Sequence, residues 1–429
     1  MTDYTLGRTV AERLRHARMI ALGDRKAPLC TTPALIGTVN DDSQLNISTN
    51  LMPFVVDYDS SSLPATMTIT GRGAMAMPFD NDSPQWECKM NHVLPPSLED
   101  SDTGVRGRSN GGLISLSWQT LRHDSELMDL PEQPEIIALV DALQLANHPG
   151  KLVSALAVLR THFPSSLLWC PGLGGPDNLA LLTWFGVDLH DFTRSRQAES
   201  LGFLLTSDGA RRPAEEYDED SDIGAQYNEW KREISAVKSA LKNGSLRQLV
   251  EKRSLNSPKL VEHLRYHDRL IREQLSDEGE FSINGAPLRR FVKYGMKWRC
   301  HSPVSRQDPL IADWIQRITS DYRAPTEQSE VLVLLPCSAR KPYSMSQSHR
   351  RFRGSLRHRP LHEVIVTSPL GLVPRELEEL WPASHYDIPV TGEWDGDELE
   401  TIHKCVKSLV SNNGYKMLIN HSGIDFDSD

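Results

Sequence analysis

The amino-acid sequence predicts an α/β fold whose C-terminal part is a doubly wound parallel sheet. Residues 331–335, VLVLL, are five apolar residues in a row, which is typical of a strand buried on both faces of a parallel sheet. Two more strands are expected at 364–366 and 415–419, and helices at 374–380 and 397–410. Because strands and helices alternate, we expect parallel strands joined by right-handed crossovers.

Three parts are expected along the chain, at residues 1–212, 213–325 and 326–429. The middle part opens with EEYDEDSD at 215–222, which predicts an exposed acidic linker. Apolar residues then recur every three or four positions, so an amphipathic helix is expected to end at Asn243 and Gly244. A second such helix is expected between 260 and 275, and the middle part is therefore interpreted as a helical connector.

The composition is typical of a cytoplasmic protein. The 429 residues include six cysteines, at positions 30, 88, 170, 300, 337 and 405, and no pair has the spacing of metal ligands. Scarce cysteine favours a reducing compartment. The first twenty residues lack the apolar run of a signal peptide, and no apolar stretch is long enough to cross a bilayer. We expect no metal, no cofactor and no contact with a membrane, and the sequence leaves a homo-oligomer open.

The loop PCSARKPYSMSQSH, residues 336–349, follows the expected strand 331–335 and is the candidate site. In open α/β sheets, ligands bind outside the carboxyl ends of the strands. Lys341 lies four residues after Cys337 and is expected to lower the pKa of its thiol, which would favour the nucleophilic thiolate. His349 is a candidate for proton transfer, since histidine titrates near neutral pH.

The hydroxyl groups of the same loop could donate hydrogen bonds to charge that develops on a substrate. They belong to Ser338, Tyr343, Ser344 and Ser346. The alternative interpretation is purely structural. In it, Cys337 is an inert small side chain, Lys341 is solvated, and the serines cap a helix that begins near Ser346.

The order and spacing of residues in this loop resemble the signature of the archaeosine synthases, an archaeal tRNA-modifying family related to tRNA-guanine transglycosylases. The resemblance rests on Pro336, Cys337, Lys341, Pro342, Tyr343, Ser346 and His349, and it continues through residues 362–395. It implies that the C-terminal domain is similar to the uracil-DNA-glycosylase α/β fold. It also implies that Cys337, Lys341, Tyr343, Ser346 and His349 are the catalytic residues.

The implied reaction adds the side-chain amine of free lysine to the nitrile of a 7-cyano-7-deazaguanine base in the tRNA D-loop. The product is an amidine, which a radical-SAM partner enzyme then converts to archaeosine. A thiolate can add to a nitrile to give a thioimidate, from which an amine displaces the sulfur. Covalent catalysis by Cys337 is one hypothesis, and direct attack by lysine beside a non-reacting Cys337 is the other.

Further side chains are expected to bind the base or the incoming lysine. Ser368 and Gly371 follow the second strand and could frame the base together with Ser338. Asp387 or Glu393 could hold the α-ammonium of lysine. The chain ends nine residues past Asn420, where the family continues with more of the α/β domain and a PUA-type RNA-binding module. The resemblance therefore implies a shortened member, for which a separate PUA-type subunit is a possible partner.

The first part, at 167–191 and 206–209, resembles the late part of a transglycosylase barrel. In that family, the second acid of the GVDLHD-like motif is the nucleophile, which places this role on Asp191. The family's base lies in a loop with an acid and two glycines, whereas 109–112 here reads SNGG, and the zinc cysteines are missing. About 200 residues are also fewer than the roughly 250 of a closed eight-stranded barrel. We therefore expect a shortened, degenerate barrel in which Asp191 is vestigial.

The net charge of −10 argues against an RNA partner only at first sight, because the basic residues are clustered. No acid occurs from Pro336 to Leu361, and this run could neutralise tRNA phosphates through Arg350, Arg351 and Arg353. A second acid-free cluster, at 289–301, mixes basic and aromatic residues. Both clusters could instead be solvated faces.

Three functions are thus open: lysine transfer to tRNA, a non-catalytic tRNA-binding subunit of a modification complex, and base exchange by the barrel-like part. The missing acid and zinc cysteines argue against base exchange.

Overall fold

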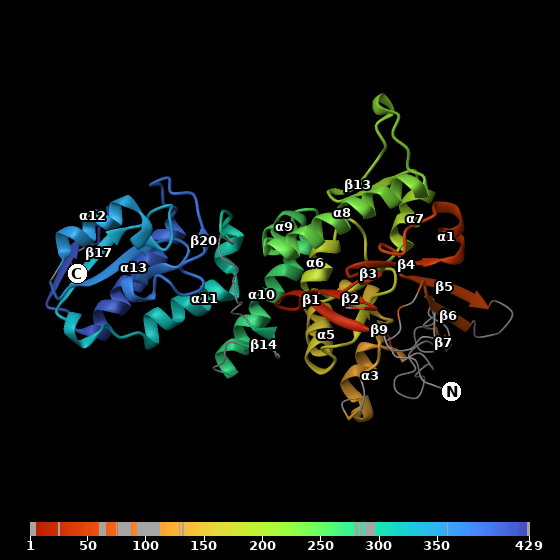
Figure 1. Ribbon diagram of the computed structural model, residues 1–429, viewed down its shortest axis with the longest axis horizontal. Coiled ribbons are helices and arrows are strands. Elements are labelled where there is room, and N and C mark those ends of the chain that lie inside the picture. The colour runs from red at the N-terminus through yellow and green to blue at the C-terminus, as the bar shows by residue number, and fades with distance from the viewer. Residues whose placement is uncertain are drawn as a thin grey trace. The chain divides into compact units, whose positions relative to one another are not determined.

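The fold is described by a computed structural model of the chain, and it divides into two compact units (Figure 1). The first unit is Met1–His267 with Asn284–Ala286, and the second is Asp268–Ile283 with Pro287–Asp429. The structure describes residues 6–24, 26–59, 66–73, 75, 87–91, 112–127, 129–130, 133–278, 282–283, 286–287, 297–357 and 359–426. The three-part division expected from the sequence stays a prediction.

The first unit is built on an eight-stranded sheet with the strand order β7-β6-β5-β4-β11-β10-β9-β8. Within it, β5, β4, β11, β10, β9 and β8 run parallel, and β6 and β7 run antiparallel. The strands are β4 (Ala34–Thr38), β5 (Phe54–Asp59), β6 (Thr66–Gly71), β7 (Glu87–Asn91), β8 (Leu113–Leu116), β9 (Ile136–Leu139), β10 (Leu167–Trp169) and β11 (Leu189–Asp191).

This order consists of two runs along the chain, from β4 to β7 and from β8 to β11. Strand β11 pairs with β4, as the last and first strands of a barrel do. The antiparallel β6 and β7 depart from an all-parallel barrel. The α/β class is thus confirmed for this unit, and descent from a transglycosylase barrel stays a prediction.

Helices follow the parallel strands, and two small sheets complete the first unit. The helices are α1 (Val39–Leu45), α3 (Trp118–His123), α4 (Ala142–Ala146), α5 (Pro149–His162), α6 (Leu179–Trp184) and α7 (Thr193–Ser200). The small sheets are formed by β1 (Arg8–Leu14), β2 (Ala17–Leu22) and β3 (Cys30–Thr31), and by β12 (Leu204–Thr206) and β13 (Gly209–Arg211).

Two predicted helices are confirmed. They are α8 (Ile223–Asn243), which ends at Gly244 with a positive φ of 70°, and α10 (Pro258–Glu278), with the shorter α9 (Leu246–Ser254) between them. Most of the acidic residues at 215–222 are exposed, as expected. Glu219 nevertheless pairs with Arg211, and the Asp222 side chain caps α8 by accepting a hydrogen bond from the Ala225 N–H at 2.7 Å.

A buried ion cluster forms around Asp188, the residue directly before β11 in the first unit. The Asp188 carboxylate accepts hydrogen bonds from Arg18 at 2.9 Å and from Arg160 at 2.7 Å, and it also accepts one from the Leu168 N–H. All three charged side chains are at most 4% exposed. Burial alone would raise the pKa of Asp188, but Arg18 and Arg160 together lower it below its ordinary value.

The second unit contains a four-stranded sheet with the order β19-β18-β17-β21. Its strands are β17 (Val331–Pro336), β18 (His362–Thr367), β19 (Gly371–Pro374) and β21 (Met417–Asn420). Its helices are α11 (Pro309–Gln316), α12 (Gln347–Leu356) and α13 (Gly396–Asn413). The short strands β16 (Trp298–Arg299) and β20 (Tyr386–Asp387) pair in parallel, as a separate ladder. A two-residue pair, β14 (Ser282–Ile283) and β15 (Ala286–Pro287), precedes them.

Strands β18, β17 and β21 are parallel, which confirms the predicted arrangement for the three strands expected. The helix predicted at 374–380 is wrong. Residues 371–374 instead form β19, which pairs antiparallel with β18 and buries Leu372 and Val373 completely, so the sheet is mixed. After Pro374 only a single turn, Arg375–Leu377, follows.

Strand β21 is an edge strand whose side chains are exposed on both faces, since the neighbouring residues Met417 and Leu418 are 58% and 41% exposed. Within the described residues, no helix is long and apolar enough to cross a membrane.

Candidate functional site

The Cys337 thiol lies at the carboxyl end of β17, where the sequence places it, and it is half-buried. Its neighbours are the Lys341 ammonium and the Thr367 hydroxyl at the end of β18. Burial raises the pKa of the thiol, and this effect outweighs the lowering by Lys341 and by the hydrogen bond from Thr367. The expectation of a lowered thiol pKa is therefore wrong, although the expected partner is present.

The Lys341 side chain is enclosed by aromatic rings. Its Nζ lies 4.0 Å from the centre of the Tyr386 ring and 5.7 Å from that of Tyr343. The Nζ atom is buried, and it makes no hydrogen bond to any described residue. Burial lowers the pKa of Lys341, opposed by the charges of Cys337 and Asp387. Cys337 and Lys341 are thus both shifted toward their neutral forms.

A chain of hydrogen-bonded hydroxyl groups lies next to Cys337 and Lys341. Tyr343 is completely buried, its hydroxyl contacts that of Tyr386, and Tyr386 contacts the Thr367 hydroxyl. Burial raises the pKa of both phenols, so both remain protonated and can donate hydrogen bonds. Sequence reasoning missed Thr367 and Tyr386. The position of Thr367 at the end of a parallel strand was an available signal.

His349 is buried beside Tyr343, and both of its ring nitrogens have partners. Nδ1 accepts a hydrogen bond from Arg375 at 2.9 Å, so Nε2 donates to the Pro336 carbonyl at 3.0 Å. Burial, followed by the charge of Arg375, lowers the pKa of His349 to about 4. The ring is therefore neutral at physiological pH, and it fixes the backbone directly before Cys337.

The serines of the loop have local partners. The Ser346 hydroxyl caps α12 by accepting a hydrogen bond from the His349 N–H at 3.2 Å. Ser338 donates to the Arg340 carbonyl at 3.1 Å. The purely structural interpretation of the loop predicted a serine cap at the start of a helix near Ser346, and this cap is present. It also predicted a solvated Lys341, but Lys341 is half-buried.

Of the predicted substrate-binding residues, Asp387 interacts with Lys341, whereas the contacts described for Ser368, Gly371 and Glu393 are with other residues. Asp387, on β20, interacts electrostatically with Lys341 and therefore belongs to the site. Ser368 donates a hydrogen bond to Glu398 at 2.6 Å, and a Cβ at Gly371 would come within 2.7 Å of the Cys405 sulfur. Glu393 is exposed, and no described contact joins it to Cys337 or Lys341.

Arg350, Arg351 and Arg353 are exposed on α12, the helix that begins directly after the loop. Arg350 also donates a hydrogen bond to the Met345 carbonyl at 3.1 Å. Among the described residues, none of the three forms an ion pair with an acid. Residues 288–296, which hold most of the second basic cluster, lie outside the described residues.

In the first unit, Asp191 lies at the end of β11 and is 8% exposed. Its carboxylate accepts hydrogen bonds from the Trp169 indole at 2.9 Å, the Gly172 N–H at 2.9 Å and the Thr193 N–H at 3.0 Å. These three hydrogen bonds hold the Asp191 carboxylate in place, and its vestigial character stays a prediction. The loop residues 109–111, expected to replace the family's base, lie outside the described residues.

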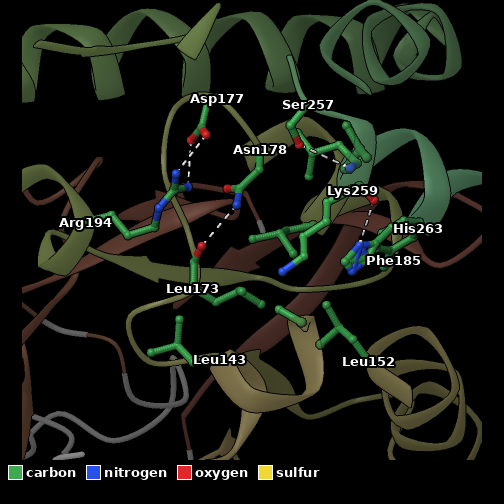
Figure 2. Close-up of a pocket in the computed structure, with 14 residues that line it drawn as sticks. Leu143, Leu152, Leu173, Asp177, Asn178, Phe185, Arg194, Ser257, Lys259 and His263 are labelled. Carbon is green, nitrogen blue, oxygen red and sulfur yellow. Dashed lines mark hydrogen bonds and ion pairs between the residues drawn. The ribbon is translucent and has the colours of Figure 1, made fainter. Parts of the chain in front are cut away.

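The first unit also has a cavity of about 180 Å³ (Figure 2). Its wall is mainly apolar, and Asp177 and Arg194 form a bidentate ion pair at one side, at 2.7 and 2.8 Å. The His263 ring faces it and contacts the Lys259 carbonyl through Nδ1. None of the predicted site residues lines this cavity.

Comparison with known proteins places these two units in context. A family model described as a domain of unknown function, DUF5591, matches residues 311–428, which include the whole loop. An archaeosine synthase subunit alpha from Methanosarcina acetivorans is 30% identical over 364 residues, covering 77% of this chain and 55% of the relative. An archaeosine synthase from Haloferax volcanii is 31% identical over 311 residues, covering 66% and 49%.

A tRNA-guanine(15) transglycosylase from Methanobrevibacter smithii is 28% identical over 199 residues, covering 45% of this chain and 27% of the relative. The chain spans about half the length of the archaeosine synthases it matches. The resemblance seen in the sequence is confirmed, because several archaeosine synthases are similar to this chain over more than half of its length.

Proposed function

We propose that this protein modifies tRNA in archaeosine biosynthesis, by transferring lysine to the nitrile of 7-cyano-7-deazaguanine in the D-loop. The proposal rests on one observation. A thiol, an amine and a chain of hydroxyl donors converge where β17 and β18 end, in a chain similar to archaeosine synthases. A nitrile needs a nucleophile at carbon and a proton at nitrogen, and this cluster could supply both.

In the proposed reaction, the Cys337 sulfur bonds to the nitrile carbon while one carbon–nitrogen π bond breaks. The thiol proton passes to the nitrile nitrogen and gives a thioimidate. The neutral side-chain amine of lysine then attacks the same carbon, the carbon–sulfur bond breaks, and a proton from the amine returns to sulfur. The product is an amidine, and the thiol is regenerated without an oxidant or a cofactor.

Lys341 is the proposed proton carrier, because its lowered pKa brings its two protonation states closer in energy beside the thiol. Tyr343 and Tyr386 would act on the developing charge through the chain of hydroxyl groups that ends at Thr367, beside Cys337. His349 and Ser346 would act through position, since His349 holds Pro336 and Ser346 caps α12. The rival is direct attack by lysine, with Cys337 only lining the pocket.

The tRNA, free lysine, a radical-SAM enzyme and a PUA-type subunit are the proposed partners. The barrel-like unit is proposed to bind rather than exchange bases, because the Asp191 carboxylate already accepts three hydrogen bonds. The second candidate function is a non-catalytic tRNA-binding subunit, which the exposed arginines of α12 favour.

Labelled lysine distinguishes these functions. When the full chain is incubated with labelled lysine and tRNA that carries the cyano-deazaguanine base, label is expected in the RNA. The control is the same tRNA with guanine at that position, which has no nitrile and should stay unlabelled. Binding of tRNA without label in either RNA would favour the non-catalytic subunit.

Charge reversal of Arg350, Arg351 and Arg353 to Glu is expected to weaken tRNA binding and to flatten its salt dependence. Each lost phosphate contact reduces the slope of log affinity against log salt by about 0.7 to 0.9. Filter binding at several salt concentrations measures both quantities. The matched control reverses the acidic residues Asp218 and Asp220, which lie exposed in the first unit and should change binding little. Parental affinity in the arginine variant at moderate salt would show that this run is only a solvated face.

A further inference from the structure

The face of the second unit beside Lys341 carries three basic side chains in alternation. Residues 297–301 alternate between exposed and buried, with Trp298 and Cys300 inside. Side chains of a strand point alternately to opposite faces, so Lys297, Arg299 and His301 share the exposed face. The pairing of β16 with β20 places Arg299 directly opposite Asp387.

Within the described residues, Asp387 is the only acid that forms an ion pair with these basic side chains. The Lys297 Nζ lies 3.5 Å from one carboxylate oxygen, and the His301 Nε2 lies 3.8 Å from the other. Both distances are longer than a typical hydrogen bond. The carboxylate therefore attracts these two side chains electrostatically, and its oxygens can still accept hydrogen bonds from a ligand. The Asp387 side chain is 24% exposed, which leaves room for a ligand to reach it.

Two backbone hydrogen bonds fix this geometry. The Cys300 N–H donates to the Asp387 carbonyl at 2.8 Å, and the Trp298 N–H donates to the His385 carbonyl at 2.9 Å. Lys341 interacts with Asp387, Lys297 and Cys337, so one side chain connects this face to the thiol.

We infer that Lys297, Arg299, His301 and Asp387 form a clamp for the zwitterionic end of a free α-amino acid. Asp387 accepts from the α-ammonium, and the basic side chains donate to the α-carboxylate. The four-carbon side chain of lysine separates these groups from its reacting amine, so a clamp beside the thiol suits this substrate. The inference rests on the proposed function and extends it, because it assigns the residues that select an amino acid over a plain amine.

The test compares three amines in the transfer assay with the full chain. Cadaverine lacks the α-carboxylate, and 6-aminohexanoate lacks the α-ammonium. The Lys297→Met variant is expected to raise KM for lysine about tenfold, the scale of one charge-assisted hydrogen bond, and to change KM for cadaverine less than twofold. Asp387→Asn is expected to raise KM for lysine by a similar factor, and to raise it more for lysine than for 6-aminohexanoate, which has no α-ammonium for Asp387 to hold. The matched control is Lys416→Met, because Lys416 is exposed and pairs with Glu330 at 2.6 Å.

Equilibrium dialysis of labelled lysine against the full chain, without tRNA, separates the clamp from the reaction. Binding by the parent that Lys297→Met weakens and Lys416→Met does not would support the clamp, even if no label reaches RNA. Absence of lysine binding at millimolar concentration would overturn the clamp. Equal loss of lysine and cadaverine transfer in Lys297→Met would overturn it as well. Failure of transfer by the parent alone would count against the proposed function only.

Discussion

Replacing Cys337 with alanine is expected to reduce lysine transfer by about 10⁴-fold or more, the scale on which enzymes lose activity without their nucleophile. The thiol lies at the end of β17, and it interacts with the Lys341 amine and the Thr367 hydroxyl. The nitrile carbon is proposed to bind beside it. Without it, the addition must occur in one step, without the thioimidate. Initial rates with labelled lysine and cyano-deazaguanine tRNA measure the loss.

The covalent intermediate can be trapped directly. Wild-type protein mixed with the tRNA in the absence of lysine should gain the mass of the modified RNA, and Cys337→Ala should not. Cys170→Ala is the control for loss of a cysteine, because Cys170 is buried in the first unit. Near-native thermal unfolding of each variant would show that the fold is intact. Retention of most activity by Cys337→Ala would favour direct attack by lysine.

The second large effect concerns stability. Asp188→Asn is expected to lower the free energy of unfolding of the first unit by about 3–5 kcal/mol, because it leaves two buried guanidinium groups without their common counter-ion. Burial, with the charge of Arg18, already lowers the pKa of Arg160 to about 9, so its charge depends on Asp188. Urea unfolding followed by tryptophan fluorescence measures the change.

Asp177→Asn is the matched control. Its pair with Arg194 has the same chemistry, but the two side chains are 14% and 28% exposed, so a loss of only about 1 kcal/mol is expected. If Asp188→Asn unfolded within 1 kcal/mol of the parent, the buried cluster would not contribute as described.

The sequence alone predicts those features that local pattern determines. The apolar run before Pro336 identifies β17, and the rule that ligands bind at strand ends identifies the loop. The α8 helix and its Gly244 end follow from periodicity and from the ease with which glycine adopts positive φ. These features depend on residues that are neighbours along the chain.

Features that depend on distant residues were missed or mispredicted. Pro374 is a good first residue of a helix, but tertiary pairing with β18 makes it the end of a strand. The pKa of Cys337 is set by burial under elements that lie far along the sequence, and Lys341 alone cannot reverse that effect. Tyr386, 43 residues from Tyr343, lies on β20, and its contact with Tyr343 depends on tertiary structure that no local pattern predicts.

The raised pKa of Cys337 also bears on how this thiol survives in the cell. Peroxide and alkylating reagents react with the thiolate, and burial keeps most of this cysteine protonated at neutral pH. A permanent thiolate would be oxidised to sulfenic acid and then to sulfinic acid whenever the concentration of oxidants increased. In the proposed reaction, the sulfur would act as a nucleophile only while an acceptor for its proton is bound, so chemical durability and selectivity for a proton-accepting electrophile would both follow from the same burial.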